Sequence, residues 1–257
     1  MSKKTPHVGL FVTCIVDMMR PVVGFATLKL LEDAGCRVSV PESQTCCGQP
    51  AYNSGDRADA SALAKRVIAT YEPFDYVVMP SGSCAGMIRI HYPDLFADDP
   101  QWRDRARCLA DKTFELTGFL ADVLKADITP PAFKAHATYH DSCSGLREMG
   151  IKDQPRKLLQ KVEGLTLSEA ERAEECCGFG GTFALKYTDI SAAMVDRKVD
   201  AVLASGADVV LGGDMGCLMN IAGKITRRGE ATQVRHVAEV LSGLTDTPSI
   251  GRGKDEA

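Results

Sequence analysis

The sequence predicts an α/β protein built from two internally repeated lobes, each with short parallel strands flanked by helices. Two observations support this prediction. Short apolar segments alternate with segments of helical period along most of the 257 residues, and four features recur in the same order in the two halves. Strands that are apolar throughout are typical of parallel sheets, because helices cover both faces of such sheets.

The elements follow from local patterns. The expected strands are short apolar or β-branched runs, at 7–13, 36–40, 75–79, 135–139 and 207–211. The expected helices have apolar residues three or four positions apart, at 21–34, 56–70, 103–111, 116–125, 154–162, 189–204, 217–227 and 235–243. Ligands of such folds bind beyond the carboxyl ends of the strands.

The repeat has four parts in each half: a strand running into a cysteine, a CCG triplet, an apolar strand followed by small residues and a cysteine, and a helical segment. Matching cysteines are separated by 129 to 133 residues. Such nearly constant spacing indicates an internal duplication. The cysteines that recur are Cys14, Cys46, Cys47 and Cys84 in the first half, and Cys143, Cys176, Cys177 and Cys217 in the second.

The duplication sets the expected domain boundaries. We predict a first lobe at 1–126, a linker at 127–135 that contains the Pro130-Pro131 pair, a second lobe at 136–245 and a polar tail at 246–257.

Composition narrows the class of protein. The chain is 45% hydrophobic and 25% charged, as in a folded globular protein, and its net charge of −4 argues against a nucleic-acid surface. No apolar stretch approaches the roughly 20 residues that span a bilayer. The apolar run near the N-terminus is too short for a signal peptide and is better explained as a strand. We therefore expect a cytoplasmic protein without an integral membrane segment.

Ten cysteines are unusual for such a chain. Disulfides are rare in a reducing cytosol, so clustered cysteines there favour metal or redox chemistry. All eight recurring cysteines are predicted metal ligands, four in each lobe. Cys36 and Cys108 have no partner in the repeat and are expected to be ordinary thiols.

Four thiolates suit either a tetrahedral zinc ion or an iron–sulfur cluster. Structural zinc sites commonly use CxxC spacings, whereas a cluster with several irons offers separate attachment points for adjacent thiols. A cluster is therefore favoured, and zinc or a dithiol redox pair stay as alternatives. The glycines beside the thiols permit close approach of backbone N–H groups to a cofactor; they are Gly48, Gly178, Gly180 and Gly181.

The doubled C-x31–32-CCG-x(n)-C pattern resembles the CCG-domain, or cysteine-rich, proteins, which include a subunit of heterodisulfide reductase and the iron–sulfur subunit of glycolate oxidase. "QTCCGQPAYNSGD", "MPSGSCAGMIR", "YHDSCSGLREMGI", "ECCGFGGTF" and "DMGCLMNI" look nearest to the lactate-utilization members. The resemblance covers roughly residues 7 to 243. It implies related α/β lobes that hold two iron–sulfur clusters, [4Fe–4S] in type, one per lobe.

The resemblance also implies a function. The chain would be an electron-transfer subunit, not autonomous as an enzyme, in a complex that oxidises L-lactate to pyruvate. Its partners would be companion subunits that include a ferredoxin-like iron–sulfur protein. The alternative is a catalytic subunit of heterodisulfide reductase type that reduces a disulfide or another acceptor, and a zinc-stabilised interaction module is a third hypothesis.

The sequence departs from the fullest family pattern, which ends in CxxC. Ser81 and Asp214 occupy the places of the additional thiols, and both are possible oxygen ligands. No catalytic residue is identified. The candidate is His140, because it precedes Cys143, has no counterpart in the first half, and could relay protons or donate a hydrogen bond to a cluster.

Overall fold

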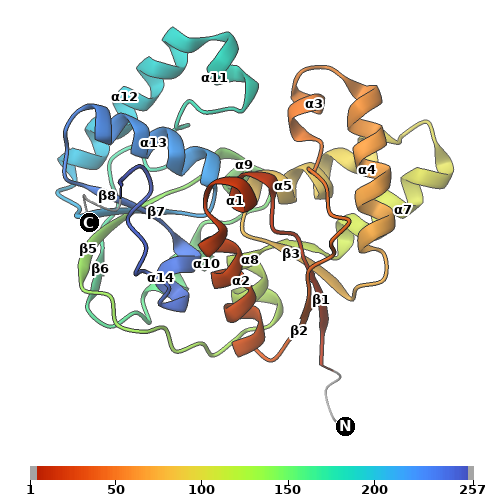
Figure 1. The fold of residues 1–257 in the computed structure, drawn as a ribbon, viewed down its shortest axis with the longest axis horizontal. Helices are drawn as coiled ribbons and strands as arrows, with labels where there is room; N and C mark the ends of the chain where they lie inside the picture. The colour runs from red at the N-terminus through yellow and green to blue at the C-terminus, as the bar shows by residue number, and fades with distance from the viewer. Residues whose placement is uncertain (1–4, 254–257) are drawn as a thin grey trace.

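The computed structural model describes residues 5–253 (Figure 1). Within them lie two four-stranded parallel sheets with the strand orders β2-β1-β3-β4 and β6-β5-β7-β8. The predicted fold class of two α/β lobes is thereby confirmed. The strands are β1 His7–Leu10, β2 Arg37–Ser39, β3 Tyr76–Met79, β4 Thr113–Glu115, β5 Ala135–His140, β6 Leu165–Leu167, β7 Val209–Gly212 and β8 Gln233–His236.

Helices connect the strands of each sheet. In the first lobe they are α1 Cys14–Met19, α2 Pro21–Asp33, α3 Gln49–Asn53, α4 Arg57–Tyr71, α5 Gly82–Gly86, the π-helical turn η1 Met87–His91, α6 Tyr92–Leu95, α7 Pro100–Asp111, α8 Leu116–Gly118 and the π-helical turn η2 Phe119–Val123. In the second lobe they are α9 Cys143–Arg147, α10 Asp153–Leu159, α11 Thr182–Lys186, α12 Thr188–Ala204, α13 Met215–Arg227 and α14 Val237–Ser242.

Three strands have no counterpart in the sequence prediction: β4, β6 and β8. Two of them have three residues and all lie at sheet edges, and polar residues, such as Glu115 in β4, Thr166 in β6 and Arg235 in β8, break the apolar run that marks β1, β3 and β7. The helix expected at 235–243 begins two residues later, at Val237, because β8 extends through His236.

The two lobes share helices across their boundary. The last helix of the second lobe, α14, packs against α2 of the first, and α8 with η2 at the end of the first lobe packs against α10 of the second. These helices gather below the centre of Figure 1. One apolar core accordingly contains β1 residues such as Val8 and Leu10 together with β7 residues such as Val210 and Leu211.

The segments outside the sheets also have defined places. Residues 127–134 contain no helix or strand, and β5 begins at Ala135. In the tail predicted at 246–257, Ile250 is buried and its N–H donates to Val234 O at 2.9 Å, whereas 254–257 lie outside the described residues, as do residues 1–4 of the first lobe. Across 5–253, no helix has the length and apolar character needed to cross a bilayer.

Candidate metal centre

Four of the recurring cysteines lie where central strands end. Cys14 and Cys143 begin the helices α1 and α9, just after β1 and β5. Cys84 lies in α5 after β3, and Cys217 lies in the first turn of α13 after β7. Because the strands are parallel, these four cysteines lie beyond the carboxyl edges of their sheets.

The CCG triplets form the same turn in both lobes. Gly48 has φ 85° and Gly178 has φ 84°, a left-handed conformation that glycine adopts without a Cβ penalty. Their N–H groups donate to the sulfur two residues earlier, at 3.4 Å for Cys46 Sγ and 3.3 Å for Cys176 Sγ. The turn therefore orients the first thiol of each pair by a backbone hydrogen bond.

The second cysteine of each pair is held through its carbonyl group. Tyr92 Oη donates to Cys47 O at 2.8 Å, and Asn220 Nδ2 donates to Cys177 O at 2.9 Å. Tyr92 and Asn220 carry no sign of this role in the sequence, because each is more than forty residues from the cysteine that it contacts.

In the first lobe the four predicted thiols contact one another in series. Cys14 Sγ lies 3.9 Å from Cys46 Sγ, and the Cys47 side chain hydrogen-bonds with those of Cys46 and Cys84. Hydrogen bonds from Cys14 and then Cys47 lower the pKa of Cys46, whereas the hydrogen bond to Cys46 and burial raise the pKa of Cys14.

The second lobe repeats this series. Side-chain contacts join Cys143 to Cys176, Cys176 to Cys177, and Cys177 to Cys217. In both lobes the first two thiols are half-buried and the last two are buried.

His140 adds an imidazole to the second series. One of its ring nitrogens and the sulfurs of Cys177 and Cys217 lie within 4.8 Å of one another. The residue is 3% exposed, and neither ring nitrogen has a hydrogen-bond partner. Burial, followed by the nearby charge of Lys198, lowers the pKa of His140 to about 3, so the ring is neutral at physiological pH.

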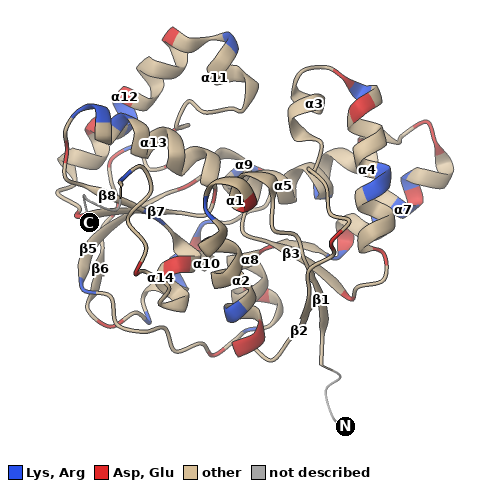
Figure 2. Ribbon diagram, in the orientation of Figure 1, with Lys and Arg blue, Asp and Glu red and all other residues tan. Residues whose placement is uncertain are grey.

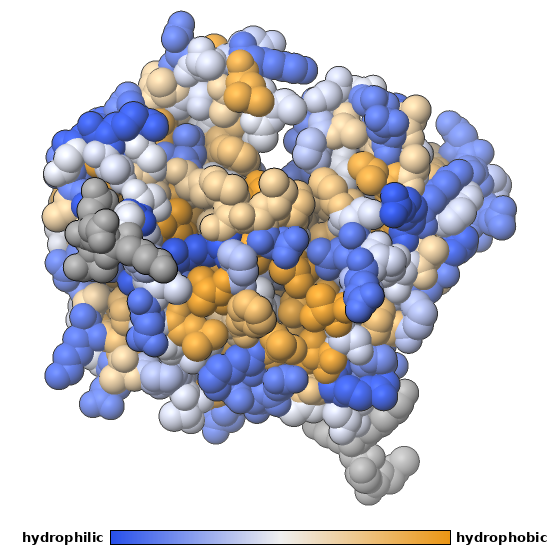
Figure 3. All heavy atoms as spheres, viewed as in Figure 1, coloured by the Kyte–Doolittle hydropathy of each residue, from blue (hydrophilic) through white to orange (hydrophobic). Residues whose placement is uncertain are grey.

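Both series open onto one cavity of about 510 Å³ between the lobes. Figure 3 shows a notch between the projections that carry α3 and α11, and residues of both helices line the cavity. Among the described residues that line it, cysteines aside, Asp214 is the one with an ionisable side chain. Figure 2 shows α3, α5 and the first half of α13 without charged residues. Six of the recurring cysteines are among the lining residues: Cys14, Cys46, Cys47, Cys84, Cys143 and Cys217.

The glycines predicted to contact a cofactor divide into two groups. Gly48 and Gly178 make the turns described above, and Gly180 and Gly181 line the cavity with φ of 50° and 60°.

Ser81 and Asp214 contact each other across the lobe boundary. Ser81 Oγ donates to Asp214 Oδ1 at 3.2 Å, and Ser83 donates to the same carboxylate from its N–H and its hydroxyl, both at 2.8 Å. Burial raises the pKa of Asp214. Both predicted oxygen ligands thus line the shared cavity, and the carboxylate also ties the two lobes together.

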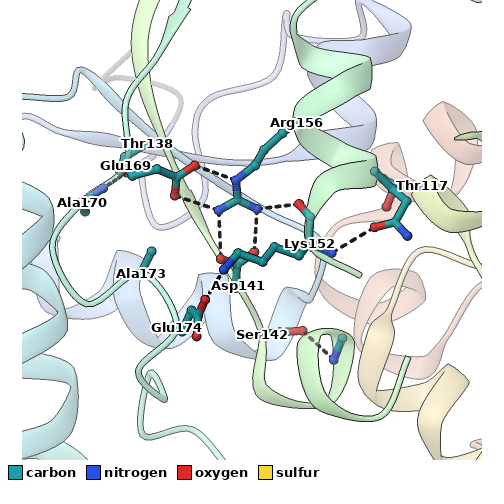
Figure 4. Close-up of polar contacts among 12 residues, drawn as sticks. Thr117, Thr138, Asp141, Ser142, Lys152, Arg156, Glu169, Ala170, Ala173 and Glu174 are labelled. Atoms are coloured by element: carbon teal, nitrogen blue, oxygen red, sulfur yellow. Dashed lines mark hydrogen bonds and ion pairs between the residues drawn. The ribbon is translucent and has the colours of Figure 1, made fainter. Parts of the chain in front are cut away.

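An ion pair fixes the short segment between β5 and Cys143. Asp141 is 2% exposed and accepts two hydrogen bonds from Arg156, each at 2.8 Å, and Arg156 also binds Glu169 (Figure 4). Such a two-pronged pair restricts both side chains. Arg156 is therefore occupied by carboxylates of its own chain.

The donor set fits an iron–sulfur cluster. Four thiols in contact repel one another when ionised, and a cationic centre relieves that repulsion. The N–H groups of Gly48 and Gly178 donate to cysteine sulfur, as donors around clusters do. Both ring nitrogens of His140 lack a partner although they are buried beside Cys177 and Cys217. An all-thiol set also suits zinc, so zinc stays as the alternative metal.

A family model described as the cysteine-rich domain, CCG, matches the chain twice, over residues 8–89 and 137–222. The two matches coincide with the two cysteine series.

Several curated proteins are similar over most of the chain. Lactate utilization protein A of Bacillus cytotoxicus is 52% identical over 235 residues, which cover 91% of this chain and 98% of that protein. The protein of the same name from Exiguobacterium sp. is 52% identical over 239 residues, covering 92% and 97%. That of Bacillus subtilis is 51% identical, covering 91% and 98%.

A solved structure shares the fold. The crystal structure of a hypothetical protein from Helicobacter pylori matches with a TM-score of 0.65 at 10% sequence identity. The match covers 99% of this chain but 51% of that one, so this chain spans about half the length of that protein. From the doubled family match and the close relatives, the chain belongs to the cysteine-rich, or CCG-domain, family.

Proposed function

We propose that this chain is a cytoplasmic iron–sulfur electron-transfer subunit of a complex that oxidises L-lactate to pyruvate. The observation that carries the proposal is the pair of cysteine series, which contact in the same order in both lobes. The naming of the relatives as lactate utilization protein A supports the choice of substrate.

The residues that would hold the cofactors are the recurring cysteines. Each lobe would bind one cluster, [4Fe–4S] in type, through its four thiolates, and Ser81 and Asp214 are the candidates for additional oxygen contacts. A bound cluster of this kind accepts and donates single electrons. The chain itself supplies thiolates, N–H donors from Gly48 and Gly178, and a cavity with little charge.

The shared cavity favours electron transfer over lactate binding. Oxidising lactate to pyruvate removes two electrons and two protons, and the substrate carries a carboxylate. A buried carboxylate needs a cationic partner, yet no Lys, Arg or His occurs among the described residues that line the cavity, and Asp214 would oppose an anion. Companion subunits, including a ferredoxin-like iron–sulfur protein, would therefore bind lactate and exchange electrons with this chain.

Metal analysis tests the cofactor. Protein purified without oxygen should contain iron and acid-labile sulfide, with an EPR signal after reduction. Cys84→Ser and Cys217→Ser should each remove the iron of one lobe and leave that of the other. Cys108→Ser is the matched control, because Cys108 is exposed and outside both series. Protein that holds zinc and no sulfide would refute the iron–sulfur assignment.

Activity of the complex tests the role. This chain alone should not oxidise lactate with a dye acceptor, whereas the complex with its companions should, and Cys84→Ser should lower that rate while Cys108→Ser leaves it unchanged. Full lactate oxidation by the isolated chain would contradict the electron-transfer role.

The shared cavity also favours a second candidate, in which the chain itself reduces a disulfide or another acceptor. One cavity reaches thiols of both lobes, and the apolar side chains of Phe179, Leu185 and Met215 form part of its lining. A small organic acceptor would fit beside both centres. Rapid reoxidation of the reduced chain by a disulfide, without companions, would favour this candidate.

A further inference from the structure

The imidazole ring of His140 is buried, but no group of the protein within residues 5–253 forms a hydrogen bond with it. The residue ends β5 and is almost fully buried, and both ring nitrogens lack a hydrogen bond. A buried polar group without a hydrogen-bond partner destabilises the folded state. One of the two nitrogens of a neutral imidazole carries a lone pair that a metal can use.

The nearest candidate ligand groups are the two most buried thiols of the second lobe. Ligand atoms of His140, Cys177 and Cys217 lie within 4.8 Å of one another, yet neither nitrogen hydrogen-bonds with either sulfur. Metal–nitrogen bonds of about 2.0 Å and metal–sulfur bonds of about 2.3 Å separate two such ligand atoms by at most about 4.3 Å. A small inward movement of these side chains would therefore bring the three ligand atoms within bonding distance of one metal ion.

The first lobe has an apolar residue at the matched position. His7 in β1 and His136 in β5 occupy equivalent places, since the N–H of each donates to an aspartate, Asp75 or Asp208, and the ring of each contacts a serine. Four residues further on, the first lobe has Phe11 where the second has His140.

Phe11 cannot bind a metal. It is fully buried, and its ring packs 5.4 Å from that of Tyr71 in the apolar core of the first lobe. The two lobes therefore share their thiols but differ in this one group.

We propose that His140 is a nitrogen ligand of the metal centre in the second lobe, so that this chain holds two chemically different centres. This inference rests on the proposed function, in which the cysteine series bind iron–sulfur clusters. The first-lobe centre has thiolate donors, and the second-lobe centre has the same four thiolates with an imidazole as a fifth protein donor.

The imidazole also makes the reduction potential of the second centre sensitive to the residue at position 140. A neutral imidazole in place of an anionic thiolate raises the potential of an iron–sulfur centre, because less negative charge surrounds the iron. Replacing the imidazole of His140 by a thiolate should therefore lower the potential of the second centre and leave that of the first unchanged.

Pulsed EPR on the reduced, full-length protein tests the ligand directly. The wild type should show a strongly coupled nitrogen whose signal changes when histidine is labelled with ¹⁵N. His140→Phe, which installs the residue of the first lobe, should abolish this signal while the iron of the first centre remains. His91→Gln is the control, because His91 lies in η1 of the first lobe, where its ring contacts Tyr52 and Glu148, and it should leave the signal intact.

A second variant distinguishes loss of the nitrogen ligand from loss of the whole second-lobe centre. His140→Cys restores a donor to iron and should retain the metal without the nitrogen signal, and it should lower the potential of the second centre alone. Iron-loaded wild type with no strongly coupled nitrogen, or a signal that survives His140→Phe or disappears in His91→Gln, would overturn the ligand assignment. A wild type without iron or sulfide would instead overturn the proposed function.

Discussion

At the scale of single residues, the two lobes differ at matched positions that surround their boundary. Phe11 is matched by His140, and Glu115 at the end of β4 is matched by His236 at the end of β8. Glu115 accepts hydrogen bonds from the N–H groups of Thr117 and Gly118 and caps α8, and His236 caps α14 in the same way. The two lobes thus keep the same capping geometry, but the cap is a carboxyl group in the first lobe and an imidazole in the second.

Glu115 should make stability depend on pH. Burial raises the pKa of this carboxyl from 4.5 to about 7, against the lowering effect of its hydrogen bonds. The folded state therefore holds the proton more tightly than the unfolded state, and stability falls as the pH rises from about 4.5 to 7, by up to ~3 kcal/mol.

The measurement is urea unfolding of metal-free protein between pH 5 and pH 8. Wild type should lose stability across this range relative to Glu115→Gln, which keeps a carbonyl acceptor but does not ionise. Glu163→Gln, at an exposed position, should follow the wild type. Parallel pH curves for wild type and Glu115→Gln would show that the burial of this carboxyl has no such effect.

At the scale of elements, the CCG turn depends on the helix that packs behind it. A Cβ on Gly178 would lie 2.7 Å from Ser191 O of α12, and a Cβ on Gly48 would lie 3.4 Å from Ala60 O of α4. Both glycines have the same left-handed φ. The second-lobe turn is thus packed more closely than its copy.

We expect Gly178→Ala to be more destabilising than Gly48→Ala. Each substitution adds about 1 kcal/mol of backbone strain, and a clash with a backbone carbonyl adds about 1–3 kcal/mol at Gly178 alone. Gly206→Ala is a control for strain without a clash, since Gly206 has φ 68° and nothing within 4 Å of the added Cβ. Equal losses of unfolding free energy for Gly178→Ala and Gly206→Ala would contradict this account.

At the scale of the molecule, the lobes form one packed body. The apolar core contains residues of both sheets, α14 packs on α2, and Gly82 of α5 approaches Gly145 of α9 so closely that a Cβ on Gly82 would lie 2.6 Å from Gly145 Cα. Asp214 adds polar contacts with Ser81 and Ser83. The cavity between the cysteine series exists because the lobes are held in this arrangement.

The chain should therefore unfold in one cooperative transition. Trp102, the one tryptophan of the sequence, packs against the core of the first lobe and reports on that lobe, while far-UV circular dichroism reports on both. The two urea curves should coincide. A fluorescence transition separated from the circular dichroism transition would mean that the lobes unfold independently.

The sequence by itself determined the duplication, the parallel α/β lobes and the cysteine set. These features are local: apolar runs mark the central strands, and adjacent thiols followed by glycine mark the turn before a helix. The edge strands β4, β6 and β8 were missed because they have only three or four residues and polar side chains interrupt their apolar run.

Only the tertiary structure decided which groups meet. It joined the thiols into two series beside one cavity, placed His140 beside Cys177 and Cys217, and paired Ser81 with Asp214 across 133 residues of sequence. Contacts between lobes depend on how helices pack over both sheets, and local pattern carries no information about that packing. The identity of the recurring thiols therefore follows from the sequence, and their arrangement beside one cavity follows from the fold.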